Sequence, residues 1–227
     1  MTGTDGEDAL LDLLGLLAYA ELVAFFRLSD DASLAPSLAD KAALAEMAAA
    51  EFAHFGKLRS QLALMGVAVE QAMLPFVEPL DAFHARTAPA DWLEALVKAY
   101  VGDGIAADFY RGVAAVLDPQ VGELITEVLA DTGHAGFVVP RVRAAIEADP
   151  AVAGRLALWA RRLVGEALAQ AHRVVAERPA LVRLLTGSGG TAGGGQGEIG
   201  RMFAEVTDAH DERMAAMGLA GPVRATA

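Results

Sequence analysis

The sequence predicts an all-α fold, a four-helix bundle with one long crossover connection and two additional C-terminal helices. Of its 227 residues, 54% are hydrophobic, chiefly alanine and leucine, and only 6% are aromatic. That composition is typical of packed helices rather than of a sheet, where β-branched and aromatic residues dominate. Prolines and glycines also divide the chain into segments of helical length. A chain of this size can bury one substantial core.

The first two helices form a predicted hairpin. We expect helices at 7–31 and 37–64, joined by the loop 32–36. Ser37 can cap the second helix, with Asp40 in its first turn. The long crossover then covers 67–89. Because it contains Pro75, Pro79 and Pro89, we expect no continuous helix there, and at most a turn at 80–85.

The remaining helices are predicted in the same way, from the prolines and glycines that separate them. We expect them at 90–117, at 119–148 with a kink at Pro140, at 150–185 with an uneven end past Pro179, and at 198–217. Seven of the eleven residues from 187 to 197 are glycine, which indicates a flexible linker. The expected organisation is a helical bundle domain (1–185), a glycine-rich linker (186–197), and a C-terminal helix with its tail (198–227), the helix docking on the bundle or on a partner chain.

Composition also limits the location and the chemistry. The longest apolar run, 9–28, contains Asp12 and Glu21 and lacks a basic leader, so we interpret it as a core helix and expect a cytoplasmic protein without membrane contact. The chain has no cysteine. Disulfides, iron–sulfur clusters and cysteine-bound iron are therefore excluded, and any metal must bind through oxygen and imidazole nitrogen.

The charge is unevenly distributed. The chain carries a net charge of −12, which disfavours binding to nucleic acid. The stretch from 141 to 183, however, contains eight arginines and four acidic residues, and so has a local charge of +4. Two interpretations stay open for this stretch: a phosphate-binding face, or a solvated helix face paired with neighbouring carboxylates. The candidate phosphate contacts are Arg155, Arg161, Arg162 and Arg173.

Acidic residues and histidines interrupt apolar helix faces in a repeated pattern. Glu21 lies in an apolar stretch with no basic residue within five positions, although burying an isolated carboxylate is costly. Glu51 and His54 stand at positions i and i+3, one turn apart on one helix face, and Asp131 and His134 repeat this spacing 80 residues later. A single such pair is common by chance. Two pairs on alternate helices predict a metal site.

The third predicted helix, at 90–117, offers two candidate acids for the metal site. In an antiparallel hairpin, facing ligands lie equally far from the turn, and the midpoint of Glu21 and Glu51 falls at residue 36, in the expected loop. With Asp131 as the facing residue, Asp108 gives a midpoint at the predicted 118–119 turn, whereas Asp103 gives residue 117. Asp108 is the first choice. Asp103, whose flanking glycines can loosen the backbone, remains the alternative.

These residues resemble the di-iron carboxylate pattern of the ferritin-like superfamily. The segments 18–28, 50–55, 100–111 and 130–134 further resemble actinobacterial ferritin-like proteins of the MiaE-like family, which is named for tRNA 2-methylthio-isopentenyladenosine hydroxylation. The likeness covers most of 9–217. The metal ligands that it implies are Glu21, Glu51, His54, Asp108 (or Asp103), Asp131 and His134.

The resemblance implies two iron ions, with other divalent metals as the alternative, and O₂-dependent hydroxylation of an isopentenyl group on an adenosine in tRNA. It also implies an electron-donor protein, and the apolar faces of the last two helices suggest a homodimer. Two other functions stay open. One is a rubrerythrin-like or ferritin-like protein that oxidises or binds iron or removes peroxide, and the other is a non-catalytic helical interaction module.

Overall fold

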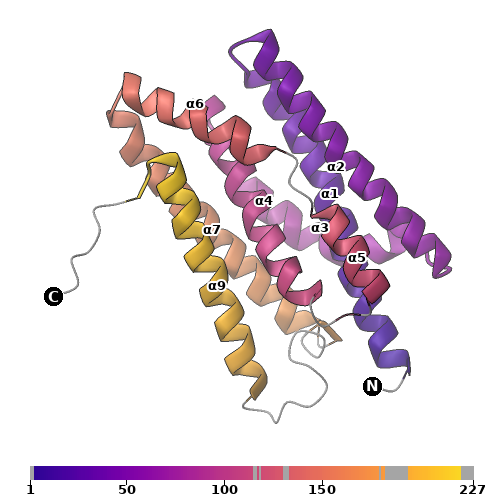
Figure 1. Ribbon diagram of the computed structural model, residues 1–227. Helices are drawn as coiled ribbons and strands as arrows, with labels where there is room; N and C mark the ends of the chain where they lie inside the picture. The colour runs from indigo at the N-terminus through magenta and orange to yellow at the C-terminus, as the bar shows by residue number, and fades with distance from the viewer. Residues whose placement is uncertain are drawn as a thin grey trace.

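The fold is a bundle of long helices, which confirms the predicted all-α class (Figure 1). The computed structural model describes residues 3–114, 117, 119–129, 133–178, 180–181 and 194–220. Its elements are α1 (Gly3–Asp31), the short 3-10 helix η1 (Ala32–Leu34), α2 (Leu38–Leu64), α3 (Val69–Arg86), α4 (Trp92–Ala114), α5 (Pro119–Val128), α6 (His134–Ala148), α7 (Ala151–Glu177) and α9 (Gly194–Met217).

The helices α1 and α2 form the predicted antiparallel hairpin and lie side by side along one edge of the molecule (Figure 1). Ser37 caps α2 as expected: its hydroxyl accepts a hydrogen bond from the backbone N–H of Asp40 at 3.1 Å. The Asp40 carboxylate in turn accepts from the Arg141 guanidinium of α6 at 2.6 Å. This ion pair ties the middle of α6 to the hairpin.

The crossover contains a helix where none was expected. The helix α3 runs through both Pro75 and Pro79. A proline inside a helix costs about 3 kcal/mol because it removes a backbone donor and crowds the preceding turn. Burial of Met73 and Phe76 in the core beside α1 offsets that cost, since each buried large side chain contributes about 1.5–3 kcal/mol. The sequence prediction was wrong here because it weighed the prolines without this packing.

The second hairpin is also interrupted. Where one kinked helix was expected at 119–148, α5 ends at Val128 and α6 begins at His134. Gly133 precedes α6 with φ +87°, a left-handed conformation that favours glycine. The break therefore lies at Gly133, while Pro140 is accommodated inside α6.

A second core joins α4, α6, α7 and α9. The helix α7 ends at Glu177, whereas the helix was expected to continue unevenly to 185; residues 180–181 are helical, and 182–185 lie outside the described residues. The helix α9 packs on α4, α6 and α7 of its own chain (Figure 1), so the C-terminal helix docks in cis. It begins at Gly194, inside the segment predicted as linker.

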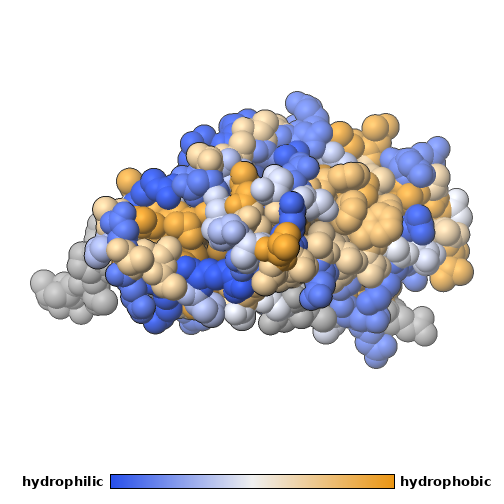
Figure 2. Space-filling model, turned by 90° about the horizontal axis from the view of Figure 1, so that it is seen from above, coloured by the Kyte–Doolittle hydropathy of each residue, from blue (hydrophilic) through white to orange (hydrophobic). Residues whose placement is uncertain are grey.

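Among the described helices, the segment Gly6–Leu34 is the one long and apolar enough to cross a membrane. Half of its most apolar window is buried against other helices, as expected for a core helix of a bundle. On the face seen in Figure 2, hydrophilic side chains border the hydrophobic ones. The exposed apolar residues include Leu34 and Leu38, at the turn between α1 and α2.

The close crossing of α1 and α3 depends on Gly15, where a methyl group would overlap the backbone carbonyl of Ala72. We expect Gly15→Ala to lower the free energy of unfolding by about 1–3 kcal/mol, as overpacking does. Gly56→Ala is the matched control, because a methyl group there meets nothing within 4 Å and stabilises a helix by up to ~1 kcal/mol. Urea denaturation measures both. Equal effects of the two substitutions would contradict the proposed crossing.

Candidate metal centre

Two clusters of metal-ligand side chains lie between the hairpins and share one residue, Glu51. The first cluster is Glu21, Glu51 and His54, and the second is Glu51, Asp103 and His134. Within each cluster, one ligand atom per residue lies within 4.8 Å of the others. The helices α1, α2, α4 and α6 thus supply the site, with the hairpin prediction confirmed for Glu21 and Glu51.

The first cluster is deeply buried. Glu21 and His54 are each 8% exposed and Glu51 is 5% exposed. The His54 Nδ1 atom lies 3.4 Å from Glu21 Oε2 and 3.8 Å from Glu51 Oε2. Among the described residues, Glu21 Oε2 and His54 Nδ1 have no hydrogen-bond partner. Buried polar atoms are nearly always satisfied, so two adjacent exceptions indicate a place for a cation.

The protonation of this cluster fits the same interpretation. Burial raises the pKa of Glu21 to about 9, against a smaller lowering by His54. Contacts with Glu21 and then Glu51 raise the pKa of His54 to about 9. Burial opposes ionisation of Glu51, but its interactions with His54 and Glu21 lower its pKa. Without a metal, Glu21 and His54 therefore keep their protons at neutral pH. A bound cation would displace these protons, because it binds to the same side chains.

The second cluster uses the other oxygen of Glu51. The His134 Nε2 atom lies 3.9 Å from Glu51 Oε1, and its Nδ1 atom lies 3.7 Å from Asp103 Oδ2. His134 is buried, while the Asp103 side chain is 43% exposed. Since the two oxygens of Glu51 face different histidines, this carboxylate can bridge two cations. Imidazole nitrogen and carboxylate oxygen suit iron, manganese or zinc.

The structure brings Asp103, and not the first choice Asp108, into the cluster. Asp108 accepts hydrogen bonds at 2.7 Å from Arg111 and at 2.7 Å from Arg213 of α9. The midpoint argument paired Asp108 with Asp131 and assumed one continuous helix after the turn, whereas α5 ends at Val128 and α6 begins at His134. A Cβ atom at Gly104 would overlap the Arg213 side chain, so α4 and α9 pack closely at this point.

One predicted ligand, Asp131, lies outside the described residues. The i,i+3 argument for Asp131 and His134 required both on one helix, but His134 is the first residue of α6. His134 nevertheless reaches the site, because the backbone turn at Gly133 directs the start of α6 towards α2 and α4.

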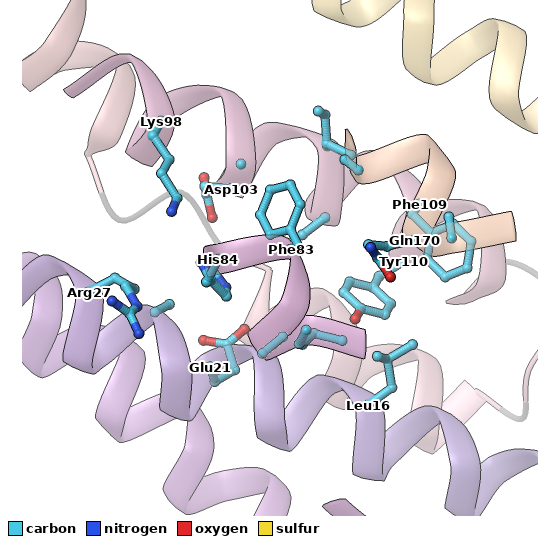
Figure 3. A pocket seen from close by; sticks show the side chains of 18 of the residues that line it. Leu16, Glu21, Arg27, Phe83, His84, Lys98, Asp103, Phe109, Tyr110 and Gln170 are labelled. Carbon is cyan, nitrogen blue, oxygen red and sulfur yellow. The ribbon is translucent and has the colours of Figure 1, made fainter. Parts of the chain in front are cut away.

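A cavity of about 280 Å³ adjoins the metal cluster and is mostly apolar. Figure 3 shows its labelled side chains, with Glu21 and Asp103 on the wall of the cavity. Sequence reasoning missed six polar residues that also line it: Arg27, Asp31, His84, Lys98, Tyr110 and Gln170. A lone lysine in the apolar run 92–101 was the available signal for Lys98. His84 was missed because α3 was not expected.

The arginine-rich stretch is partly neutralised within the chain. Arg155 forms ion pairs with Asp91 at 2.8 Å and Glu94 at 2.6 Å. Arg162 donates to the backbone carbonyl of Arg86 and lies over the Trp159 ring. The other two candidates for phosphate contact, Arg161 and Arg173, are exposed on α7.

Comparison with protein families adds independent support for the fold. A family model described as ferritin-like domain, actinomycetes, matches residues 5–188, which include α1 to α7. The C-terminal helix α9 lies beyond the matched segment. Among curated proteins, none matches this chain.

The raised pKa of Glu21 predicts how metal-free protein responds to pH. The unfolded carboxyl loses its proton near its ordinary pKa of 4.5, whereas the folded one keeps it until about pH 9. The folded state therefore binds more protons in this window, and stability falls as pH rises through it. We expect Glu21→Gln to flatten this decline and to stabilise the metal-free protein at pH 8 by about 1–3 kcal/mol.

Thermal denaturation in chelator at pH 5 and pH 8 measures this effect, with exposed Glu46→Gln as the matched control. A Glu21→Gln variant that tracks the wild type at both pH values would show that Glu21 does not hold the extra proton.

Proposed function

Because the chain belongs to the ferritin-like domain family of actinomycetes, we propose that its two clusters bind two iron ions and that the protein is an O₂-dependent hydroxylase. The fold and the buried carboxylate–histidine cluster fit a di-iron protein. The donor set supports iron, since reduced iron binds well to mixed carboxylate and imidazole ligands.

Each ligand has a distinct task in this proposal. Glu21 and His54 hold one ion, Asp103 and His134 hold the other, and Glu51 lies between them with one oxygen towards each histidine. Asp131 is proposed as a further ligand from its sequence position. When bound, the reduced iron pair supplies the electrons that activate O₂.

The observation that carries the hydroxylase proposal is the apolar cavity beside the cluster. An apolar cavity of about 150 Å³ holds a benzene molecule, so the 280 Å³ here suits an organic group of roughly a dozen non-hydrogen atoms. The cavity walls exclude water from the ligands on one side, which protects a reactive site from wasteful side reactions. An iron-storage site requires no such cavity.

The proposed substrate is a prenylated (isopentenyl) adenosine in tRNA. Its support is the sequence resemblance together with a cavity that accommodates a five-carbon isopentenyl group. In the reaction one oxygen atom enters the C–H bond and the other leaves as water, with two electrons from a donor protein and two protons. The exposed Arg161 and Arg173 are the proposed phosphate contacts. A cytoplasmic location and a homodimer remain predictions.

Turnover with labelled oxygen tests the proposal. The iron-loaded, reduced protein is mixed with ¹⁸O₂ and either prenylated tRNA or the free isopentenyladenosine nucleoside. We expect one ¹⁸O atom in the product by mass spectrometry. Ala106→Leu narrows the cavity and is expected to lower hydroxylation at least tenfold without loss of iron. Ala53→Leu, at an exposed position, is the matched control.

The variant His54→Ala, which lacks a proposed ligand, should form no labelled product. Rapid iron oxidation without product, unchanged in Ala106→Leu, would favour the iron-oxidising alternative. Loss of neither iron nor activity in His54→Ala would contradict the assignment of the site.

A further inference from the structure

The cavity has a polar end that the metal cluster does not use. Four side chains meet there: Arg27 and Asp31 from α1, His84 from α3 and Lys98 from α4. Figure 3 shows Arg27, His84 and Lys98 gathered at one end of the pocket, with Lys98 extending from α4 towards α1 and α3. None of these residues belongs to the two metal clusters.

Lys98 is a buried cation with little to balance it. It is 7% exposed, and its ammonium group donates to the Thr87 carbonyl at 2.7 Å and lies 5.7 Å from the centre of the Phe83 ring. Among the described residues no carboxylate lies within 4.0 Å of it. Burial lowers its pKa to about 8, so Lys98 is still mostly charged at pH 7. A buried charge without a close partner is costly.

The charges at this end do not cancel. Arg27 and Lys98 are cationic, and burial raises the pKa of Asp31 only to about 6, so Asp31 balances one of the two charges. Burial, reinforced by Lys98 and Arg27, lowers the pKa of His84 to about 3 and leaves this residue neutral. Asp30, next in the chain, does not line the cavity. Among the described side chains that line this end, one positive charge is therefore in excess, shared between the buried Lys98 and Arg27, which is exposed to solvent.

The metal cluster does not supply the missing negative charge. If two divalent ions bind, their charge of +4 would be balanced by the carboxylates of Glu21, Glu51 and Asp103 together with Asp131, which lies outside the described residues and is a ligand by proposal. The excess charge at Arg27 and Lys98 is then available to a ligand. The His84 Nδ1 atom is buried there without a hydrogen-bond partner among the described residues, and can donate or accept a further bond.

The opposite end of the cavity is mostly apolar, with one polar side chain, Gln170, beside Tyr110 (Figure 3). Its lining includes Leu16, Phe109, Leu181 and the ring of Tyr110, which pack in one hydrophobic cluster. Figure 3 shows Leu16, Phe109 and Tyr110 at this end, away from Arg27 and Lys98. Glu21 lies on the wall between the two ends (Figure 3). A ligand that spans the cavity would thus pass the metal cluster.

We propose that Arg27 and Lys98 bind an anionic group of the substrate, a carboxylate or a phosphate, while the attached apolar chain extends past the metal cluster into the apolar end. The substrate class is an amphiphile with an anionic group and an apolar chain, of which a prenylated adenosine nucleotide is one example, and the site is a specificity determinant. This inference rests on the proposed function, because it names the substrate that the di-iron site oxidises.

Calorimetric binding to the metal-loaded full-length protein tests the inference. The probes are decanoate and decanol, which share one chain and differ in charge, and isopentenyladenosine 5′-monophosphate with its uncharged nucleoside. We expect each anion to bind at least tenfold more tightly than its neutral counterpart. Lys98→Met and Arg27→Gln should each remove most of that preference and leave the affinity for the neutral probes unchanged.

The controls separate this inference from the proposed function. Arg59→Gln, at an exposed arginine on α2 that does not line the cavity, should leave all affinities unchanged, and the metal content of every sample is measured alongside. His54→Ala should lose metal yet keep the preference for anions. A stronger preference for decanoate identifies a carboxylic acid as the anion source, and one for the nucleotide identifies a phosphate. Equal binding of charged and neutral probes, or preference retained in both Lys98→Met and Arg27→Gln, would overturn the inference.

Discussion

The burial of Glu51 between two histidines is the constraint on which the rest of the structure depends. This carboxylate is 5% exposed, and its oxygens face His54 on α2 and His134 at the start of α6. A buried carboxylate is tolerated only when charges or hydrogen bonds compensate it. The hairpin, the break before α6 and the position of α4 all serve to bring those partners to it. Glu21 Oε2 and His54 Nδ1 are buried without a hydrogen-bond partner among the described residues, and a cation bound between them would satisfy both atoms.

Much of the bundle was predictable because its signals are local. Apolar periodicity, the Ser37 cap and turn residues indicate where α1 ends, where α2 begins and ends and where α7 begins, and an antiparallel hairpin then sets Glu21 opposite Glu51. The candidate ligands on the first hairpin followed from acids inside apolar stretches. That inference needs no knowledge of distant contacts, since an isolated buried charge is costly in any fold.

The remaining features depend on contacts between distant segments. The helix α3 survives two prolines because its apolar side packs on α1, and Asp103 replaces Asp108 because Arg213 of α9, 105 residues away, binds Asp108. The polar end of the cavity likewise joins Arg27, His84 and Lys98 from three helices. Contacts of this kind between distant segments cannot be predicted from residue spacing or composition.

The stoichiometry of bound metal, measured by elemental analysis of protein from iron-supplemented cells, tests the shared role of Glu51 most directly. A bridging carboxylate contributes to both metal positions, so the wild type should hold about two irons per chain and Glu51→Ala should lose both. The exposed Glu46→Ala variant should keep them. A wild type without stoichiometric metal, or a Glu51→Ala variant that still holds two irons, would contradict the account.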